Sequence, residues 1–172
     1  METIFFEKPA VIKKEKANME KQLKVKINIT GRKIDIEGAA LDEYIASIVL
    51  DAISFGFTPM QALSLKSEDM IFKKIHIRDF TRRKSLSDVR ARLIGTQGKT
   101  RRTLEEISDC SIVVNENAVG IIGPTSAIDN TVQAVINIIR GSKQANIYRF
   151  LERMNTQKED LADLGLKRKK EK

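Results

Sequence analysis

Cysteine, histidine and long apolar runs are all scarce in this chain. Cys110 is the only cysteine among 172 residues, so no disulfide can close within the chain, and a reducing compartment is favoured. No apolar stretch approaches the roughly 20 residues that cross a membrane. The segment Met1–Glu7 also lacks the basic start and apolar run of a signal peptide. We therefore expect a cytoplasmic protein that does not contact a membrane.

The side chains that usually carry catalysis or bind metals are equally few. His76 is the single histidine and lies between Ile75 and Ile77 in a strand pattern, where an outward-facing strand residue or an RNA contact is expected rather than a general base. Cys110 lacks a partner histidine, so a small core residue is the expected role. No group of histidine, cysteine or carboxylate residues has the spacing of a metal site. The sequence therefore predicts no catalytic residue, no metal and no cofactor.

Positive charge is unevenly distributed along the chain. The net charge is +8, from 31 Lys and Arg against 23 Asp and Glu. Residues 1–65 carry 9 basic and 9 acidic side chains and residues 103–172 carry 10 of each, whereas residues 66–102 carry 12 and 4. A basic surplus concentrated in one segment is typical of phosphate recognition, because neutralising phosphates releases their counterions. An even spread would indicate only a solvated surface.

The chain contains an internal repeat at an offset of 85 residues. Each copy has two alternating, strand-like segments followed by a longer segment between two glycines. In order, these are Val25–Ile29, Ile34 with Ile36, and Gly38–Gly56 in the first copy, and Cys110–Val114, Val119 with Ile121, and Gly123–Gly141 in the second. The segments between glycines have the apolar spacing of a half-buried helix. Leu41 is one of the apolar residues expected to be buried in the first of these helices. Their final glycines are suited to helix C-caps.

The second copy has further elements before its two strands. These are a strand at Met70–Ile77, a helix at Val89–Ile94 capped by Ser87 or Asp88, the tetrapeptide Gly95–Gly98, and a helix at Lys99–Ser108. Strand, helix, Gly-x-x-Gly, helix, strand, strand and long helix is similar to the order in type I K-homology (KH) modules. We therefore predict an α+β protein of two tandem type I KH-like modules, each a three-stranded antiparallel sheet packed with helices. One more helix is expected at Ala145–Asn155.

The Gly-x-x-Gly segment carries the predicted chemistry. Two glycines spaced three apart let the backbone turn sharply and approach a sugar-phosphate chain closely. In KH modules this loop clamps about four nucleotides, while their unpaired bases lie in a neighbouring groove. The predicted RNA-binding residues are the loop, the aliphatic residue before it and five flanking basic residues: Arg90, Arg92, Ile94, Gly95, Thr96, Gln97, Gly98, Lys99, Arg101 and Arg102.

Several segments give a more specific resemblance. Ile94–Arg101, Leu104–Ile107, Tyr148–Arg153 and the linker Phe55–Pro59 resemble the archaeal relatives of the ribosome-assembly protein called partner of NOB-one in eukaryotes. The resemblance covers nearly the whole chain and is weaker before the linker. It implies an assembly factor of ribosome biogenesis that binds the 3′ region of small-subunit (pre-)rRNA. It also implies contact with the NOB-one endonuclease and with the alpha subunit of translation initiation factor two.

The chain departs from the family pattern at two places. A common KH signature has an aliphatic residue three positions after the second glycine, where this chain has Arg101, so base preference cannot be transferred from other KH modules. The first copy has no glycine before Gly31 and reads Ala10–Lys16 where the loop is expected. We therefore predict a degenerate KH-like module at residues 1–65, a type I KH module with its loop and C-terminal helix at residues 66–156, and a charged tail at residues 157–172.

Two other functions are weighed against RNA binding. Gly98-Lys99-Thr100 ends like the phosphate-binding loop of nucleotide-hydrolysing enzymes. Such a loop requires a preceding strand and a glycine five residues before the Gly-Lys pair, where this chain has Leu93, so we expect no enzyme. A protein-interaction scaffold with little RNA affinity is the other alternative, because a sequence does not measure affinity.

Overall fold

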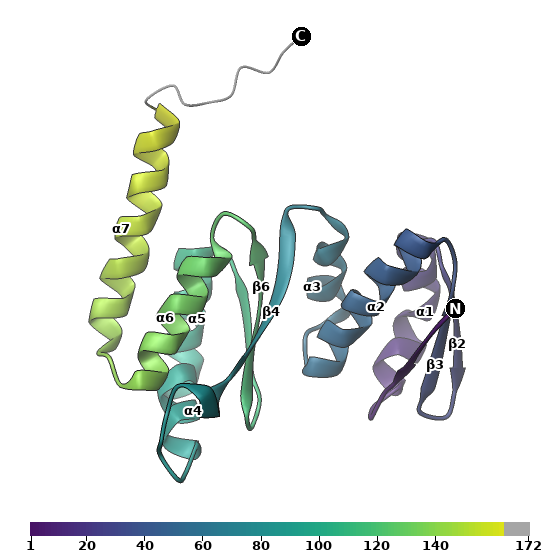
Figure 1. Cartoon of the computed structure of the whole chain (residues 1–172), viewed down its shortest axis with the longest axis horizontal. Coiled ribbons are helices and arrows are strands. Elements are labelled where there is room, and N and C mark those ends of the chain that lie inside the picture. Colours follow the sequence, from purple (N-terminus) through teal and green to yellow (C-terminus); the bar gives the residue numbers. More distant parts are fainter. Residues whose placement is uncertain (164–172) are drawn as a thin grey trace.

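The computed structural model describes residues 1–163 and contains two α+β modules, each built on one three-stranded antiparallel sheet (Figure 1). The first module consists of β1 (Glu2–Phe5), α1 (Ala10–Leu23), β2 (Lys26–Thr30), β3 (Lys33–Glu37), α2 (Ala40–Phe55) and α3 (Pro59–Leu63). The second consists of β4 (Met70–His76), α4 (Ser87–Ile94), α5 (Lys99–Ser108), β5 (Ser111–Val114), β6 (Ala118–Pro124), α6 (Ile128–Arg140) and α7 (Gln144–Asp163). The predicted fold class is confirmed.

The internal repeat extends to the pairing register of the strands. The sheets have the equivalent orders β1-β3-β2 and β4-β6-β5. Ile27 lies opposite Ile36 in the first sheet, and Ile112 lies opposite Ile121 in the second, at the same offset of 85 residues. Each module also has an equivalent hydrogen bond between a helix and the strand that follows it, in which a glutamate of the helix accepts a backbone N–H of the strand. The two bonds are Ile27 N to Glu20 Oε1 at 2.8 Å and Ile112 N to Glu105 Oε1 at 2.7 Å.

The modules differ in the segment that connects their first two strands. In the second module the chain forms α4, the Gly-x-x-Gly loop and α5. In the first module the single continuous helix α1 takes this place, and the segment Ala10–Lys16, where the loop is missing from the sequence, lies within it. The first module therefore has a sheet like that of the second, with one helix in place of α4, the loop and α5.

The two sheets also differ in how many of their faces are covered. Alternate residues of β3 are buried, which is typical of a sheet with one face on the core and one in solvent. Every residue of β6 from Ala118 to Gly123 is buried. The second sheet is covered on one face by its own helices and on the other by the side of the first module that carries α2 and α3 (Figure 1). This arrangement explains why β6 is almost entirely apolar while β3 alternates.

Three phenylalanines form the joint between the modules. The rings of Phe55, Phe57 and Phe72 lie with centroids 5.6 to 6.2 Å apart. Gly120 of β6 lies directly against this cluster, where an added Cβ would come within 2.6 Å of the Phe55 ring. Two polar contacts flank the aromatic contact, since Asn115 Nδ2 donates to the Phe55 carbonyl at 2.8 Å and Lys74 pairs with Asp51 at 2.7 Å. The module boundaries at residues 65 and 156 stay a prediction.

Some element boundaries and one buried position differ from the sequence prediction. Helix α4 begins at Ser87 rather than Val89, and no side chain caps it. Leu41 is 69% exposed, because it lies in the first turn of α2 and the buried residues of this helix, among them Val49, Leu50 and Ile53, begin only at Ala46. Helix α7 continues to Asp163 instead of ending at Asn155. The basic end of the predicted tail lies outside the described residues. Within residues 1–163, no helix has the length and apolar character required to cross a membrane.

Candidate nucleic-acid interface

The Gly-x-x-Gly loop, Gly95–Gly98, forms one tight turn between α4 and α5. Gly95, Gln97 and Gly98 all have a positive φ, of 74°, 54° and 74°. The turn closes with a hydrogen bond from Gly98 N to the Gly95 carbonyl at 3.1 Å. Thr96 and Gln97 are exposed at its tip. The loop therefore presents its middle residues to solvent, as the sequence predicted.

The two glycines of the loop are required for different reasons. An added Cβ on Gly95 would lie 2.7 Å from the backbone nitrogen of Thr100, a buried residue in the first turn of α5. On Gly98 the nearest atom would be Arg102 Nε at 3.9 Å. Gly95 thus allows α4 and α5 to pack closely, whereas Gly98 leaves an open surface that a ligand backbone can approach. The sequence pattern alone does not separate the two positions.

The start of α5 can accept an anion. No side-chain hydrogen bond caps the first turn of this helix, which begins at Lys99 directly after the loop. The backbone N–H of Lys99 donates to the Thr96 carbonyl, and the partial positive charge of the helix N-terminus still favours a nearby phosphate. Lys99 is exposed and forms no ion pair with another described residue. A backbone phosphate placed over the loop would contact both the N-terminus of α5 and the Lys99 side chain.

Two of the predicted basic residues are engaged with the protein backbone. Arg90 Nη1 donates to the Glu116 carbonyl at 2.9 Å, which fastens α4 to the turn between β5 and β6. Arg92 Nη2 donates to the Ser142 carbonyl at 2.6 Å, which fastens α4 to the segment between α6 and α7. Each guanidinium carries five N–H donors, so one contact does not exhaust it. In the structure both arginines position α4, and their contact with RNA stays a prediction.

The two arginines after the loop have different environments. Arg102 is exposed, and its Nη2 donates to the Gln97 carbonyl at 2.6 Å, which links α5 to the loop. Arg101 is partly buried, and its Nε is a buried side-chain nitrogen without a hydrogen-bond partner among the described residues. Ile94 is 38% exposed at the end of α4 and offers an apolar surface beside the loop. The structure thus brings the ten predicted residues together along α4, the loop and the first turn of α5.

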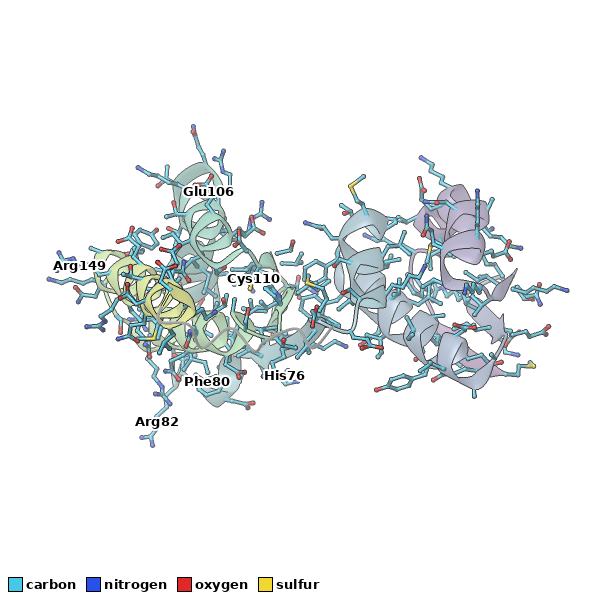
Figure 2. The ribbon with its side chains drawn as sticks, turned by 90° about the horizontal axis from the view of Figure 1, so that it is seen from above. His76, Phe80, Arg82, Glu106, Cys110 and Arg149 are labelled. Atoms are coloured by element: carbon cyan, nitrogen blue, oxygen red, sulfur yellow. The ribbon has the colours of Figure 1, made fainter. Side chains whose placement is uncertain are left out.

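Sequence reasoning missed a second group of basic residues just before α4. Arg82, Arg83 and Lys84 are exposed on a connection that Arg78 holds in place by donating to the Arg83 and Lys84 carbonyls at 2.9 and 3.0 Å. Figure 2 shows Arg82 extending from the side of the second module opposite to Glu106. The signal was present in the sequence, because these residues belong to the basic segment 66–102. They lie outside the Gly-x-x-Gly pattern, which singled out only its immediate neighbours.

The remaining candidate residues have structural or surface positions. His76 is an exposed strand residue at the end of β4, as predicted. Cys110 is buried beside Thr131 Oγ1 at 3.3 Å, and burial raises the pKa of its thiol, which keeps it protonated at neutral pH. The residues described by the structure include no group of three or more histidine, cysteine or carboxylate side chains arranged to hold a metal.

Comparison with known proteins points in the same direction as the geometry. The family model for the second KH domain of PNO1, described as "Eukaryotic type KH-domain (KH-domain type I)", matches residues 71–156. A KH domain-containing protein of Methanocaldococcus jannaschii is 33% identical over 145 residues, which are 80% of this chain and 64% of that protein. RNA-binding protein PNO1 of Oryzias latipes is 26% identical, over 74% of this chain and 56% of that protein. The chain therefore spans between half and two thirds of the length of these two relatives.

A solved structure matches over nearly its whole length. Dim2p in the crystal structure of the a/eIF2alpha-aDim2p-rRNA complex from Pyrococcus horikoshii superposes with a TM-score of 0.81 and 31% identity. The match covers 91% of this chain and 94% of that one. The likeness extends across both modules, including the first, which the family model does not cover.

Proposed function

Because this chain belongs to the family of PNO1 and archaeal Dim2p, we propose that it binds single-stranded RNA at the Gly-x-x-Gly loop during ribosomal RNA processing. The observation that carries this proposal is the exposed loop directly before the uncapped start of α5. Phosphates that approach Gly98 would meet helix N–H groups, Lys99 and the remaining donors of Arg101 and Arg102. Bases would lie toward Ile94.

The proposed target is the 3′ region of small-subunit (pre-)rRNA. The Dim2p complex from Pyrococcus horikoshii contains rRNA, which supports this target for a chain of the same family. The translation initiation factor two alpha subunit, present in the same complex, is a proposed partner, and the NOB-one endonuclease is a second one. In this proposal the chain binds and positions RNA and catalyses no reaction itself.

Single-stranded RNA matching the 3′ end of the small-subunit rRNA should bind more tightly than an unrelated oligonucleotide of the same length. Duplex RNA and duplex DNA should bind much less well, because a KH groove requires unpaired bases. If about four phosphates are contacted, the log-log dependence of affinity on salt should have a slope near −3, at about 0.7 per phosphate for single strands. Fluorescence anisotropy titrations at several salt concentrations measure both quantities. If the unrelated oligonucleotide competes equally well with the rRNA sequence, the proposal that the target is ribosomal RNA is wrong.

The first module should contribute little to binding at the loop. Lys13, Lys14 and Lys16 lie on α1, which replaces the loop in this module. Changing all three to alanine should leave RNA affinity within about threefold of wild type, which is under 1 kcal/mol. Titration of the triple variant, with circular dichroism to verify folding, tests this expectation. A hundredfold loss in a folded variant would place RNA on α1.

A further inference from the structure

We propose that the cleft between the two modules binds a nucleobase of the RNA beyond the nucleotides held by the Gly-x-x-Gly loop. This inference rests on the proposed function and extends it to a second site. The cleft, here called the inter-module cleft, has a volume of about 750 Å³, which lies in the range of small-molecule sites. Its walls include Phe6–Lys8 of the first module and His76 and Asn115–Ala118 of the second, and its floor is Ile53–Phe57.

The cleft and the loop region share one structural element, the turn Asn115–Asn117 between β5 and β6. On one side this turn lines the cleft. On the other side its Glu116 carbonyl accepts the hydrogen bond from Arg90 of α4, the helix that leads into the loop. Backbone hydrogen bonds hold the turn, from Asn115 N to Ala118 O at 2.8 Å and from Ile77 N to Asn117 O at 2.9 Å. In this proposal an RNA strand that continues from α4 across this turn would reach the cleft.

The groups at the cleft suit a flat heterocycle with hydrogen-bonding edges. The side chains of His76 and Asn117 are exposed and form no hydrogen bond with another described residue. Histidine stacks on unpaired bases, and an asparagine amide both donates to and accepts from a base edge. The buried ring of Phe57 and the partly buried ring of Phe55 make the floor apolar. Asn115 is already fixed by its bond to the Phe55 carbonyl and gives the wall a defined shape.

The charges around the cleft favour a base over a phosphate chain. Lys8 is the cation among the lining residues, which also include the acidic residues Glu7 and Glu116. Two carboxylates repel successive phosphates, whereas a carboxylate accepts hydrogen bonds from the amino group of a base such as cytosine. This distinguishes the cleft from the loop region, where the surplus is basic. The ligand class is therefore a nucleobase, with at most one phosphate near Lys8.

The inference is tested by measuring the affinity of the full chain for RNAs that differ in length and in whether their added nucleotides carry a base. A tetranucleotide covers the loop site, and the same RNA is then extended at its 5′ or 3′ end with either normal or abasic nucleotides. A normal extension at one end should raise wild-type affinity by about fivefold or more, the lower limit for one stacked base, and the abasic extension should not. The double variant His76→Ala, Asn117→Ala should reduce this gain to less than about twofold while binding the tetranucleotide normally. Asn146→Ala, at the exposed start of α7, is the matched control and should keep the full gain.

The single histidine provides a direct readout that does not depend on folding of the variants. In carbon-13-labelled protein with unlabelled RNA, the imidazole C–H resonances of His76 are unambiguous in a carbon-edited spectrum, because no other histidine is present. They should shift on addition of the normal extended RNA and stay in place with the tetranucleotide. If normal and abasic extensions give the same gain, or no extension shifts His76, a base does not occupy the cleft and the inference is overturned while loop binding stands. If the tetranucleotide and every extended RNA fail to bind, the proposed function fails with it.

Discussion

Changing Thr96 and Gln97 together to aspartate should reduce RNA affinity by at least about a hundredfold, because like charges brought together at an interface cost several kcal/mol. Both side chains are exposed at the tip of the loop, where phosphates must approach. The fold should be spared, because aspartate tolerates the positive φ of 54° at position 97 and favours the N-terminal side of a helix. Arg102 donates to the backbone carbonyl of residue 97, so this hydrogen bond does not depend on the side chain at that position.

The matched control for this variant replaces Thr96 with serine and Gln97 with asparagine. These changes keep the polarity of the loop without charge, and asparagine also tolerates a positive φ. Affinity of the control should stay within about threefold of wild type, which is under 1 kcal/mol. Titrations with single-stranded RNA and thermal melts of both variants measure the outcome. A doubly acidic variant that keeps both its melting temperature and its affinity would mean that RNA lies on another surface.

Phe57→Ala should lower the free energy of unfolding by about 3 to 5 kcal/mol, the range for removing a buried aromatic side chain. Phe57 is 3% exposed, and its ring lies against Phe55, Phe72 and the face of β6 at Gly120. The surrounding side chains cannot close the gap easily, since β6 is held between two layers. Chemical denaturation followed by circular dichroism measures the loss.

The chain offers a matched control for this change in Phe5. Phe5 is 76% exposed at the end of β1, so Phe5→Ala should change the free energy of unfolding by no more than about 0.5 kcal/mol. Equal, small effects of the two substitutions would show that the aromatic joint does not form in solution. A large loss for Phe57→Ala alone would show that the folded chain depends on the packing of Phe57.

Periodicity and repetition predicted the elements that depend on local pattern. The strand pairs and the helices between glycines were predicted because the same pattern occurs twice in the chain, 85 residues apart. Ile27 and Ile112 are equivalent positions in the two copies. The Gly-x-x-Gly loop was found because its glycines and basic neighbours are contiguous. β1 was not predicted, since Glu2–Phe5 is short and becomes a strand only by pairing with β3. Long-range pairing of this kind leaves little trace in a four-residue segment.

The parts of the site that depend on tertiary contacts could not be predicted. Nothing in the sequence distinguishes Arg90 and Arg92, which fasten α4 to distant backbone carbonyls, from Lys99, which is exposed to solvent. The two loop glycines are also alike in sequence, and only the position of Thr100 separates their roles. The same holds for Leu41, because the side of α2 that is buried depends on contacts with residues distant in the sequence.

The aromatic joint also affects how the chain is made. Domains generally form from the N-terminus during synthesis, so Phe55 and Phe57 leave the ribosome well before β6 exists to cover them. A nascent chain at this stage presents an uncovered apolar surface, which is a site for aggregation or chaperone binding. The same exposure arises when the two halves are expressed separately, because Phe72 and Ile122 then lose their cover as well. We therefore expect each module to be less soluble when it is made without the other.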